Sequence, residues 1–173
     1  MSRHWKMILS VVVLGAVVAG CGGTKLTVIQ TLEQPLTKYR TLYFAVEPAV
    51  AEDISQEVSD LEVRVIDKLN KLELFETTRL GRCPDTCANT VAIEAVITDI
   101  NKVSGGKRFW LGAFAGNAKM TANVTFIDAT TGDVIGLYTV TGDSGGTGVS
   151  GDTNSVVRGT ANEIVKLIQA NCQ

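Results

Sequence analysis

Histidine serves in most of the familiar hydrolytic sites, and this chain of 173 residues has only one, His4. Because His4 lies in a segment that we expect to be removed, the remaining chain cannot form a Ser-His-Asp triad, a Cys-His pair or an HExxH zinc site. Three carboxylates near predicted strand ends, Asp99, Asp128 and Asp133, leave a paired-carboxylate hydrolase open. Asp128 and Asp133 are also the residues that a hairpin turn favours. We therefore expect that the protein is not an enzyme.

Two cysteines that stand close together, Cys83 and Cys87, are the next candidates for chemistry. In an exported chain without histidine, this spacing favours a small loop closed by a disulfide bond. A zinc site needs four good ligands, and beyond a lipidated Cys21 only Cys172 is left, so we expect no metal. Cys172 is the odd thiol. The sequence leaves open whether it stays free, pairs with another chain or competes for Cys83 or Cys87.

Residues 146–151 match the G-x-G-x-x-G fingerprint of dinucleotide-binding sites. That fingerprint works where the chain returns to a parallel strand that carries an acidic residue for the ribose. Only a helix is predicted after this segment, so we expect a plain connection and no cofactor. Weak anion binding at the start of that helix stays open.

A glycine-rich connection carries Phe109, Trp110 and Phe114, with Lys107 and Arg108 beside them. Large apolar side chains normally become buried, and these would do so by folding back over the sheet. Alternatively they form a surface for a partner subunit, a lipid headgroup layer or a hydrophobic ligand. Basic residues next to aromatic ones suit a membrane interface. We take Phe109, Trp110 and Phe114 as the predicted binding surface.

Residues 1–20 are predicted to be a signal peptide. Arg3 and Lys6 form a positive start, and residues 7–18 are an apolar run too short to span a membrane comfortably. Val18-Ala19-Gly20-Cys21 is then typical of a bacterial lipoprotein signal, with cleavage before Cys21 and acylation of its sulfur. An ordinary membrane anchor with a chance cysteine is the alternative.

Removal of this signal sets the location and the charge of the mature chain. An aspartate directly after the lipidated cysteine tends to retain such proteins at the inner membrane; Gly22 stands there, so we expect the outer membrane. The chain has 16 basic and 18 acidic residues, and the signal holds two of the basic ones, so the mature net charge is 14 − 18 = −4. A mildly acidic chain without a basic cluster argues against nucleic-acid binding.

Hydrophobic periodicity indicates the elements that would position these residues. A period of two is that of a strand with one face on a core, and steps of three and four are those of an amphipathic helix. Residues 21–39 are expected to be a tether, although Leu26, Val28 and Ile29 leave an edge strand open. In residues 40–173, taken as one domain, the predicted strands are 41–46, 74–80, 91–103, 120–127 and 134–140, and the predicted helices are 50–72 and a last one capped by Asp152 or Thr153.

Gly112 and Gly116, the strand at 120–127, the turn Asp128-Ala-Thr-Thr-Gly132 and the double glycine at 145–146 together resemble a family of bacterial lipoproteins of unknown function. That family is similar, more remotely, to the curli secretion-channel lipoprotein and to the amino-terminal domain of the Tol-system periplasmic protein. The resemblance implies an α/β (α+β) fold, a single mixed sheet of about five strands with two helices on one face, in the order β-α-β-β-β-β-α. The extra hairpins of the curli channel have no counterpart here, so we expect no self-made pore.

These inferences combine into one functional expectation. The protein is predicted to be an outer-membrane lipoprotein whose periplasm-facing domain binds a protein partner or assembles with copies of itself. The alternative is a periplasmic carrier of a small hydrophobic or anionic ligand, which would use the aromatic connection and the glycines before the last helix.

Overall fold

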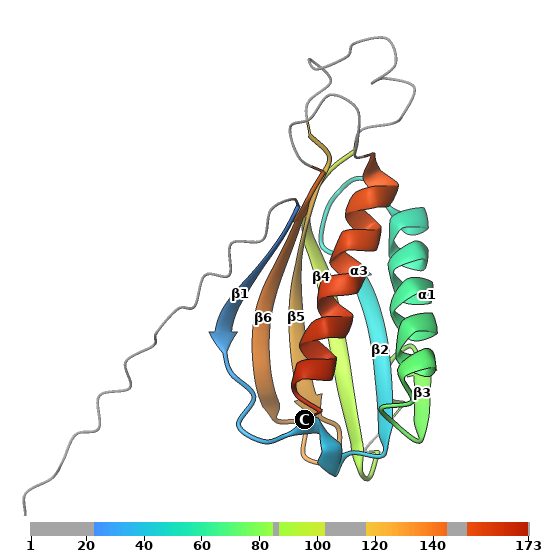
Figure 1. The fold of residues 1–173 in the computed structure, drawn as a ribbon, viewed down its shortest axis with the longest axis vertical. Helices are drawn as coiled ribbons and strands as arrows, with labels where there is room; N and C mark the ends of the chain where they lie inside the picture. The colour runs from blue at the N-terminus through green and yellow to red at the C-terminus, as the bar shows by residue number, and fades with distance from the viewer. Residues whose placement is uncertain (1–22, 85–86, 103–116, 145–151, 173) are drawn as a thin grey trace, which may run out of the picture.

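In the computed structural model, residues 23–84, 87–102, 117–144 and 152–172 are described. They form one six-stranded mixed sheet with two α-helices on one face (Figure 1). The strand order is β1-β6-β5-β4-β2-β3, and β2 is parallel to both of its neighbours while the other pairs are antiparallel. The elements are β1 Thr24–Gln30, the 3-10 helix η1 Leu36–Lys38, β2 Thr41–Pro48, α1 Ser55–Leu72, β3 Thr77–Leu80, β4 Thr90–Asn101, β5 Lys119–Asp128, β6 Val134–Asp143 and α3 Thr153–Ala170.

The β5–β6 hairpin forms where its periodicity and turn residues predict it. Met120, Ala122, Val124 and Phe126 are all fully buried on the core face of β5. Gly132 closes the turn with φ +82°, a conformation that glycine adopts without steric cost. Its backbone N–H donates to the carbonyl of Asp128 at 2.7 Å. Turn chemistry and strand alternation therefore agree, which is why this hairpin is predictable from sequence.

Helix α1 packs on the sheet through one apolar stripe, as the steps of three and four predict. The helix begins at Ser55, not at Val50, because the Asp53 carboxylate accepts hydrogen bonds from the backbone N (3.1 Å) and the Oγ (2.6 Å) of Ser55. The buried stripe is Leu61, Val65 and Leu69, each no more than 1% exposed.

Helix α3 starts at the predicted cap. The Asp152 side chain accepts a hydrogen bond from the Ser155 backbone N at 2.9 Å, which satisfies one of the free donors of the first turn. Its inner side lies over the centre of the sheet, where Ile164 and Ile168 are fully buried with Phe44 and Phe126. Burial of apolar side chains of this size stabilises the fold by about 1.5–3 kcal/mol each.

The prediction of about five strands is wrong by one, because β1 lies within the segment expected to be a tether. The edge strand that the sequence left open at Leu26 is present, and it pairs antiparallel with β6. Leu26 and Val28 lie opposite Val140 and Tyr138, on the helix-bearing face. The order is consequently β-β-α-β-β-β-β-α.

The five predicted strands are all present, and each differs from its predicted bounds at one end or both. The strand predicted over 74–80 begins at Thr77, and the one predicted over 91–103 spans Thr90–Asn101.

Candidate functional site

The start of β1, the end of β4, the start of β5 and the end of β6 lie together at one end of the sheet. Gly23 precedes β1, Asn101 ends β4, Ala118 precedes β5 and Ser144 follows β6; these four residues define what we call the loop end. The Gly23 carbonyl accepts a hydrogen bond from the Asp143 backbone N. Ala118 N donates to Ser144 Oγ, and Ser144 N donates to the Ala118 carbonyl, both at 2.9 Å. Three distant parts of the sequence therefore meet at the loop end.

Helix α3 lies very close to the sheet near the loop end. A Cβ added to Gly142 would lie 2.6 Å from Thr160 Oγ1, and one added to Gly159 would lie 3.1 Å from Thr24 Oγ1. Thr160 is fully buried, and its hydroxyl has no hydrogen-bond partner in the part of the chain that the structure describes. Small residues are thus required for the first turns of α3 to approach β6 and β1.

Lys102 joins the end of β4 to the start of α1. Its Nζ donates to the Asp53 carbonyl at 2.6 Å and lies 3.1 Å from Glu57 Oε2 and 3.6 Å from Glu52 Oε1. Desolvation of Lys102 opposes its charge, but the hydrogen bonds and charges of Glu57 and Glu52 outweigh it, so the pKa of Lys102 is raised. The acidic run at 52–57 is thereby explained as an ion pair that fixes the helix start.

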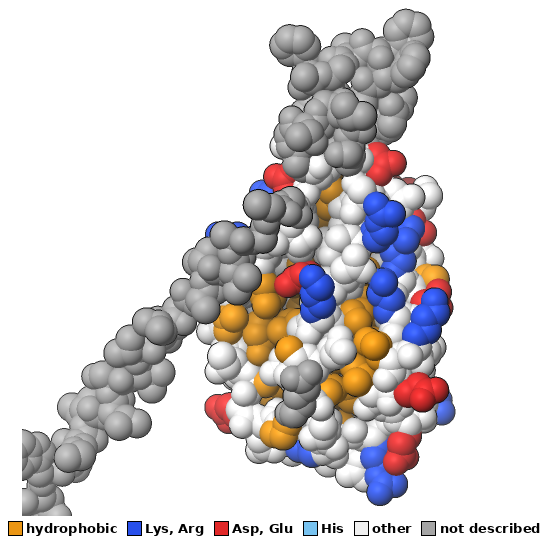
Figure 2. Space-filling model, viewed as in Figure 1, with side chains coloured by type: hydrophobic (Ala, Val, Ile, Leu, Met, Phe, Trp, Pro, Cys, Tyr) orange, Lys and Arg blue, Asp and Glu red, His pale blue; other side chains and the backbone are white. Residues whose placement is uncertain are grey.

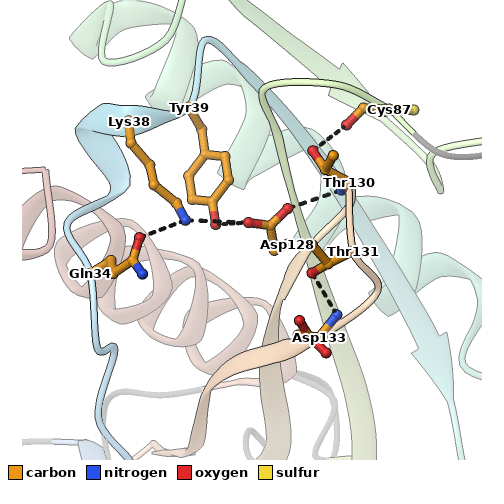
Figure 3. Close-up of polar contacts among 8 residues, drawn as sticks. All are labelled: Gln34, Lys38, Tyr39, Cys87, Asp128, Thr130, Thr131 and Asp133. Atoms are coloured by element: carbon orange, nitrogen blue, oxygen red, sulfur yellow. Dashed lines mark hydrogen bonds and ion pairs between the residues drawn. The ribbon is translucent and has the colours of Figure 1, made fainter.

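A second polar cluster lies at the opposite end of the sheet, where Lys38, Tyr39 and Asp128 point toward one another (Figure 3). Tyr39 Oη donates to Asp128 Oδ2 at 2.8 Å, and Lys38 Nζ lies 3.2 Å from the same oxygen. Lys38 also donates to Gln34 Oε1 at 2.7 Å. The backbone N of Thr130 donates to Asp128 Oδ1 at 3.0 Å. The cluster fastens η1, which leads from β1 to β2, onto the β5–β6 hairpin.

Burial and hydrogen bonding act in opposite directions on this cluster. Burial alone would raise the pKa of Asp128, but the hydrogen bonds from Tyr39, Thr130 N and Lys38 outweigh it and lower that pKa. Burial raises the pKa of Tyr39, and the Asp128 carboxylate raises it further. Asp128 is thus held as the carboxylate, and Tyr39 is held as the neutral phenol. The contacts of the cluster are those of a structural clamp between η1 and the hairpin.

An apolar groove with a basic rim lies between α1 and α3, on the helix-bearing face (Figure 2). Its volume is about 360 Å³. Leu72 and Val165 are its apolar lining, and Lys68, Lys71 and Lys166 stand around it together with Asn162. Hydrophobic side chains are visible between the lower halves of the two helices in the same view. The groove can accept an apolar group that is accompanied by negative charge.

The structure describes some of the predicted site residues and not others. Cys83 and Cys87 form a disulfide bond, as predicted, and Cys172 is a free, half-buried thiol. Burial raises the pKa of Cys172, which disfavours the reactive thiolate. Cys21 and the predicted binding surface of Phe109, Trp110 and Phe114 lie outside the described residues, as does the glycine pattern at 146–151.

Sequence reasoning missed the two side-chain clusters and the groove. Lys102, Tyr39 and Lys68 are ordinary residues in the sequence, and each gains its role from partners on another element. Within the described residues, no group of three or more His, Cys, Asp or Glu side chains is placed to hold a metal ion. None of the helices described is both long enough and apolar enough to cross a bilayer. The expectation that the protein is not an enzyme stays a prediction.

Comparison with known proteins connects the fold to solved structures. No curated protein sequence matches the chain. The dodecamer of PelC from Paraburkholderia phytofirmans matches with 12% identity and a TM-score of 0.56, covering 85% of this chain and 98% of that one. A single-substitution variant of that dodecamer matches with 11% identity and a TM-score of 0.54, covering 87% and 99%. These likenesses show a shared fold.

Another solved structure and one family model also match the chain. The crystal structure of a putative neuraminyllactose-binding hemagglutinin homolog from Helicobacter pylori matches with 9% identity and a TM-score of 0.36, covering 82% of this chain and 84% of that one. Residues 45–148, which are more than half of the chain, match a protein family of unknown function. The chain therefore belongs to the family described as "Domain of unknown function (DUF4410)".

Proposed function

We propose that this protein is an outer-membrane lipoprotein, anchored through an acylated Cys21, whose periplasm-facing domain is an assembly component of the cell envelope. The motif Val18-Ala19-Gly20-Cys21 and the apolar run before it support the anchor. Gly22, in place of an aspartate, supports the outer membrane as its location. The more remote resemblance to the curli secretion-channel lipoprotein and to the amino-terminal domain of the Tol-system periplasmic protein agrees with an envelope role.

The observation that carries the proposal is the position of β1. Its first residue, Thr24, is already paired with Gly142 in the sheet. Cys21 is only three positions earlier, and an extended chain spans about 3.5 Å per residue, so the lipid would be attached within about 10 Å of the loop end. An acylated chain would therefore stand directly on its membrane, with the loop end toward the lipid.

The aromatic connection supports the same orientation. Residues 103–116 lie outside the described residues. The residues on either side of them, Lys102 and Asn117, are both next to the loop end. Phe109, Trp110 and Phe114 are carried by the segment between them. We propose that these three side chains contact the bilayer surface or a neighbouring subunit, because aromatic residues are favoured at both kinds of interface.

Assembly into a homo-oligomer is the second part of the proposal. PelC, whose fold is similar, is a dodecamer in both of the structures compared. Both edges of the sheet, β1 and β3, lack a neighbouring strand among the described residues. Ile29 on β1 and Leu80 on β3 are 54% and 52% exposed. Unprotected edges with exposed apolar side chains are suited to contacts between chains.

The alternative proposal is a carrier of a small hydrophobic or anionic ligand. The groove between α1 and α3 favours it, since a volume of about 360 Å³ is within the range of small-molecule sites. A carrier would be purified as a monomer with a bound small molecule. An assembly component would form oligomers whose mass depends on protein concentration.

Mass spectrometry of the full chain, expressed in a diderm bacterium and extracted from membranes, tests the anchor. We expect the N-terminal peptide to begin at Cys21 and to carry acyl chains, and the Cys21→Ser variant to lack them. A product that retains Met1 without lipid would refute the proposal. Fractionation of outer from inner membranes then tests the location.

Fluorescence tests the contact surface, because Trp5 is in the predicted signal and Trp110 is then the single tryptophan of the mature chain. In vesicles that contain brominated lipids, we expect quenching of Trp110 in the acylated chain. A protein partner at this surface would instead shield Trp110 from soluble quenchers without any quenching by brominated lipid. Full exposure of Trp110 to soluble quenchers in membranes and in oligomers would contradict both.

A further inference from the structure

The edge of the sheet at β1 carries exposed apolar side chains and a carboxylate. Because β1 ends at Gln30, the first residues of β6 continue this edge farther from the loop end. Val28, Ile29 and Val134 are 39%, 54% and 48% exposed. Asp133, directly before Val134, is exposed as well. We call Val28, Ile29, Asp133 and Val134 the acidic edge.

The opposite edge of the sheet, at β3, combines an apolar side chain with a basic one (Figure 1). Leu80 is 52% exposed, and Arg79, directly before it, is exposed as well. We call Arg79 and Leu80 the basic edge. Glu76 and Arg82, the charged residues on either side of it in the sequence, each form an ion pair within the chain.

The charges of the two edges have no partner within one chain. Across the described residues, neither Arg79 nor Asp133 forms an ion pair. Lys38 is bound to Asp128 at 3.2 Å, and Lys25 lies opposite Thr141, eight positions along the chain from Asp133. One edge therefore presents an unpaired carboxylate and the other an unpaired guanidinium, each beside exposed apolar side chains, so the two are complementary.

The two edges carry these residues at matching distances from the loop end. Residues paired across neighbouring strands form rows, and one row joins Leu80 to Gly136, through Phe44, Ile93 and Phe126. The next row joins Arg79 to Val134, through Tyr43, Ala92 and Ile127. Ile29 lies between the partners of Tyr138 and Leu137, just beyond Gly136. Arg79 is thus level with Val134, and Leu80 is level with the gap between Val134 and Ile29.

We infer that the basic edge of one copy of this chain docks on the acidic edge of the next, so that the copies stand side by side in a ring. The inference rests on the proposed assembly and specifies its contact surface. A rotation about an axis perpendicular to the membrane keeps every residue at its level. Arg79 of one copy then meets Asp133 of its neighbour, and Leu80 packs between Ile29 and Val134. All loop ends remain toward the membrane.

A contact between two identical edges fits the charges less well. With all loop ends on one membrane, a two-fold axis would set Asp133 opposite Asp133, or Arg79 opposite Arg79, and like charges repel. A contact between different edges is heterologous, and it gives a ring when its rotation closes. PelC, whose fold is similar, is a dodecamer, and a single isologous contact gives only a dimer.

Charge reversal in the full acylated chain, purified in a neutral detergent, tests the charged part of the contact. Arg79→Glu sets two acidic side chains opposite each other at every contact, and Asp133→Arg sets two basic ones. We expect each variant to associate at least about tenfold more weakly than the wild type in sedimentation velocity. The control, Arg158→Glu on the exposed side of α3 and on neither edge, should associate as the wild type does.

The double variant, with both Arg79→Glu and Asp133→Arg, separates a lost contact from a damaged fold. It restores opposite charges between neighbouring copies, so we expect it to recover wild-type association. Within one chain β3 and β6 are four places apart in the sheet, which is about 19 Å at 4.8 Å per strand. Recovery would therefore come from a pair formed between copies.

Cysteine cross-linking tests whether different edges meet. The background is Cys172→Ser, since Cys21 is acylated in the proposed form and Cys83 and Cys87 are joined. A chain with both Leu80→Cys and Val134→Cys should give a ladder of covalent oligomers with a short bis-maleimide. A chain with either substitution alone should give no covalent dimer, because its thiols on neighbouring copies would be a whole subunit apart.

The remaining outcomes separate this inference from the assembly on which it rests. If the wild type forms oligomers that neither charge variant weakens, the docking surface is wrong while assembly stands. The same conclusion follows if the double variant recovers nothing, or if Leu80→Cys alone gives covalent dimers. A wild type that is monomeric at every concentration refutes assembly together with the docking surface.

Discussion

The Asp128 cluster offers the sharpest test of how the fold is held together. Asp128→Asn keeps the size of the side chain but removes its negative charge. The wild-type carboxylate accepts hydrogen bonds from Tyr39 Oη at 2.8 Å, Lys38 Nζ at 3.2 Å and Thr130 N at 3.0 Å. An asparagine oxygen can still accept from part of this set, whereas its amide group would face donors. We therefore expect the free energy of unfolding to fall.

The size of the effect follows from the burial of the partners. Tyr39 is 5% exposed, and the Asp128 side chain is 15% exposed. A hydrogen bond to a charged group contributes about 1.5–3 kcal/mol in such surroundings, while the more exposed Lys38 adds less. Asp128→Asn is expected to lower the free energy of unfolding by about 2–3 kcal/mol. Tyr39→Phe, which removes the best-shielded bond, should lower it by about 1.5–2 kcal/mol.

The pH dependence has a definite sign. Because the pKa of Asp128 is lowered in the folded chain, its contribution is present above the unfolded value of about 3.9 and is lost as pH falls through the folded value. Denaturant unfolding at pH 7 and in steps down to pH 3 should therefore show the wild type and Asp128→Asn converging. The control is Thr131→Ala in the same hairpin, which removes no titratable group, so its gap to the wild type should not depend on pH. A gap for Asp128→Asn that is equally large at pH 7 and pH 3 would refute the reasoning.

Three other substitutions test local features. Lys102→Ala removes the contacts to Glu57 and to the start of α1, so we expect about 1 kcal/mol of destabilisation and faster hydrogen exchange in the first turn of that helix. Gly142→Ala places a Cβ against Thr160 Oγ1, at 2.6 Å without rearrangement, and should lower stability by about 1–3 kcal/mol in thermal unfolding. Cys83→Ser opens a disulfide loop with a sequence separation of 4, for which chain entropy predicts a loss of about 2 kcal/mol in denaturant unfolding.

Much of the fold follows from the sequence where local signals are strong and agree. The β5–β6 hairpin has strict alternation on both sides of a turn that ends in Gly132, and α1 has an apolar stripe over several turns. In each case the element and its buried face are specified by residues a few positions apart. The Cys83–Cys87 bond is local in the same sense, and it too was predictable.

What sequence reasoning could not supply depends on distant partners. Strand β1 alternates polar and apolar residues only weakly, and it is stabilised by pairing with β6, more than a hundred positions away. Tyr39 and Asp128 are 89 positions apart, and no local pattern links them. The groove lysines likewise look like solvated helix residues until α1 and α3 are placed side by side.

The direction of the two helices connects the anchor with the proposed assembly. Both α1 and α3 have their N-termini near the loop end and run away from it (Figure 1). The partial positive charge of each helix start is met within the chain, by Glu57 in the first turn of α1 and by the capping carboxylate of Asp152 on α3. The same arrangement directs the C-terminal turns, and with them the groove, away from the bilayer. Substitutions at the loop end and substitutions in the groove would thus act on opposite ends of one parallel helix pair, so their effects on anchoring and on assembly can be measured separately.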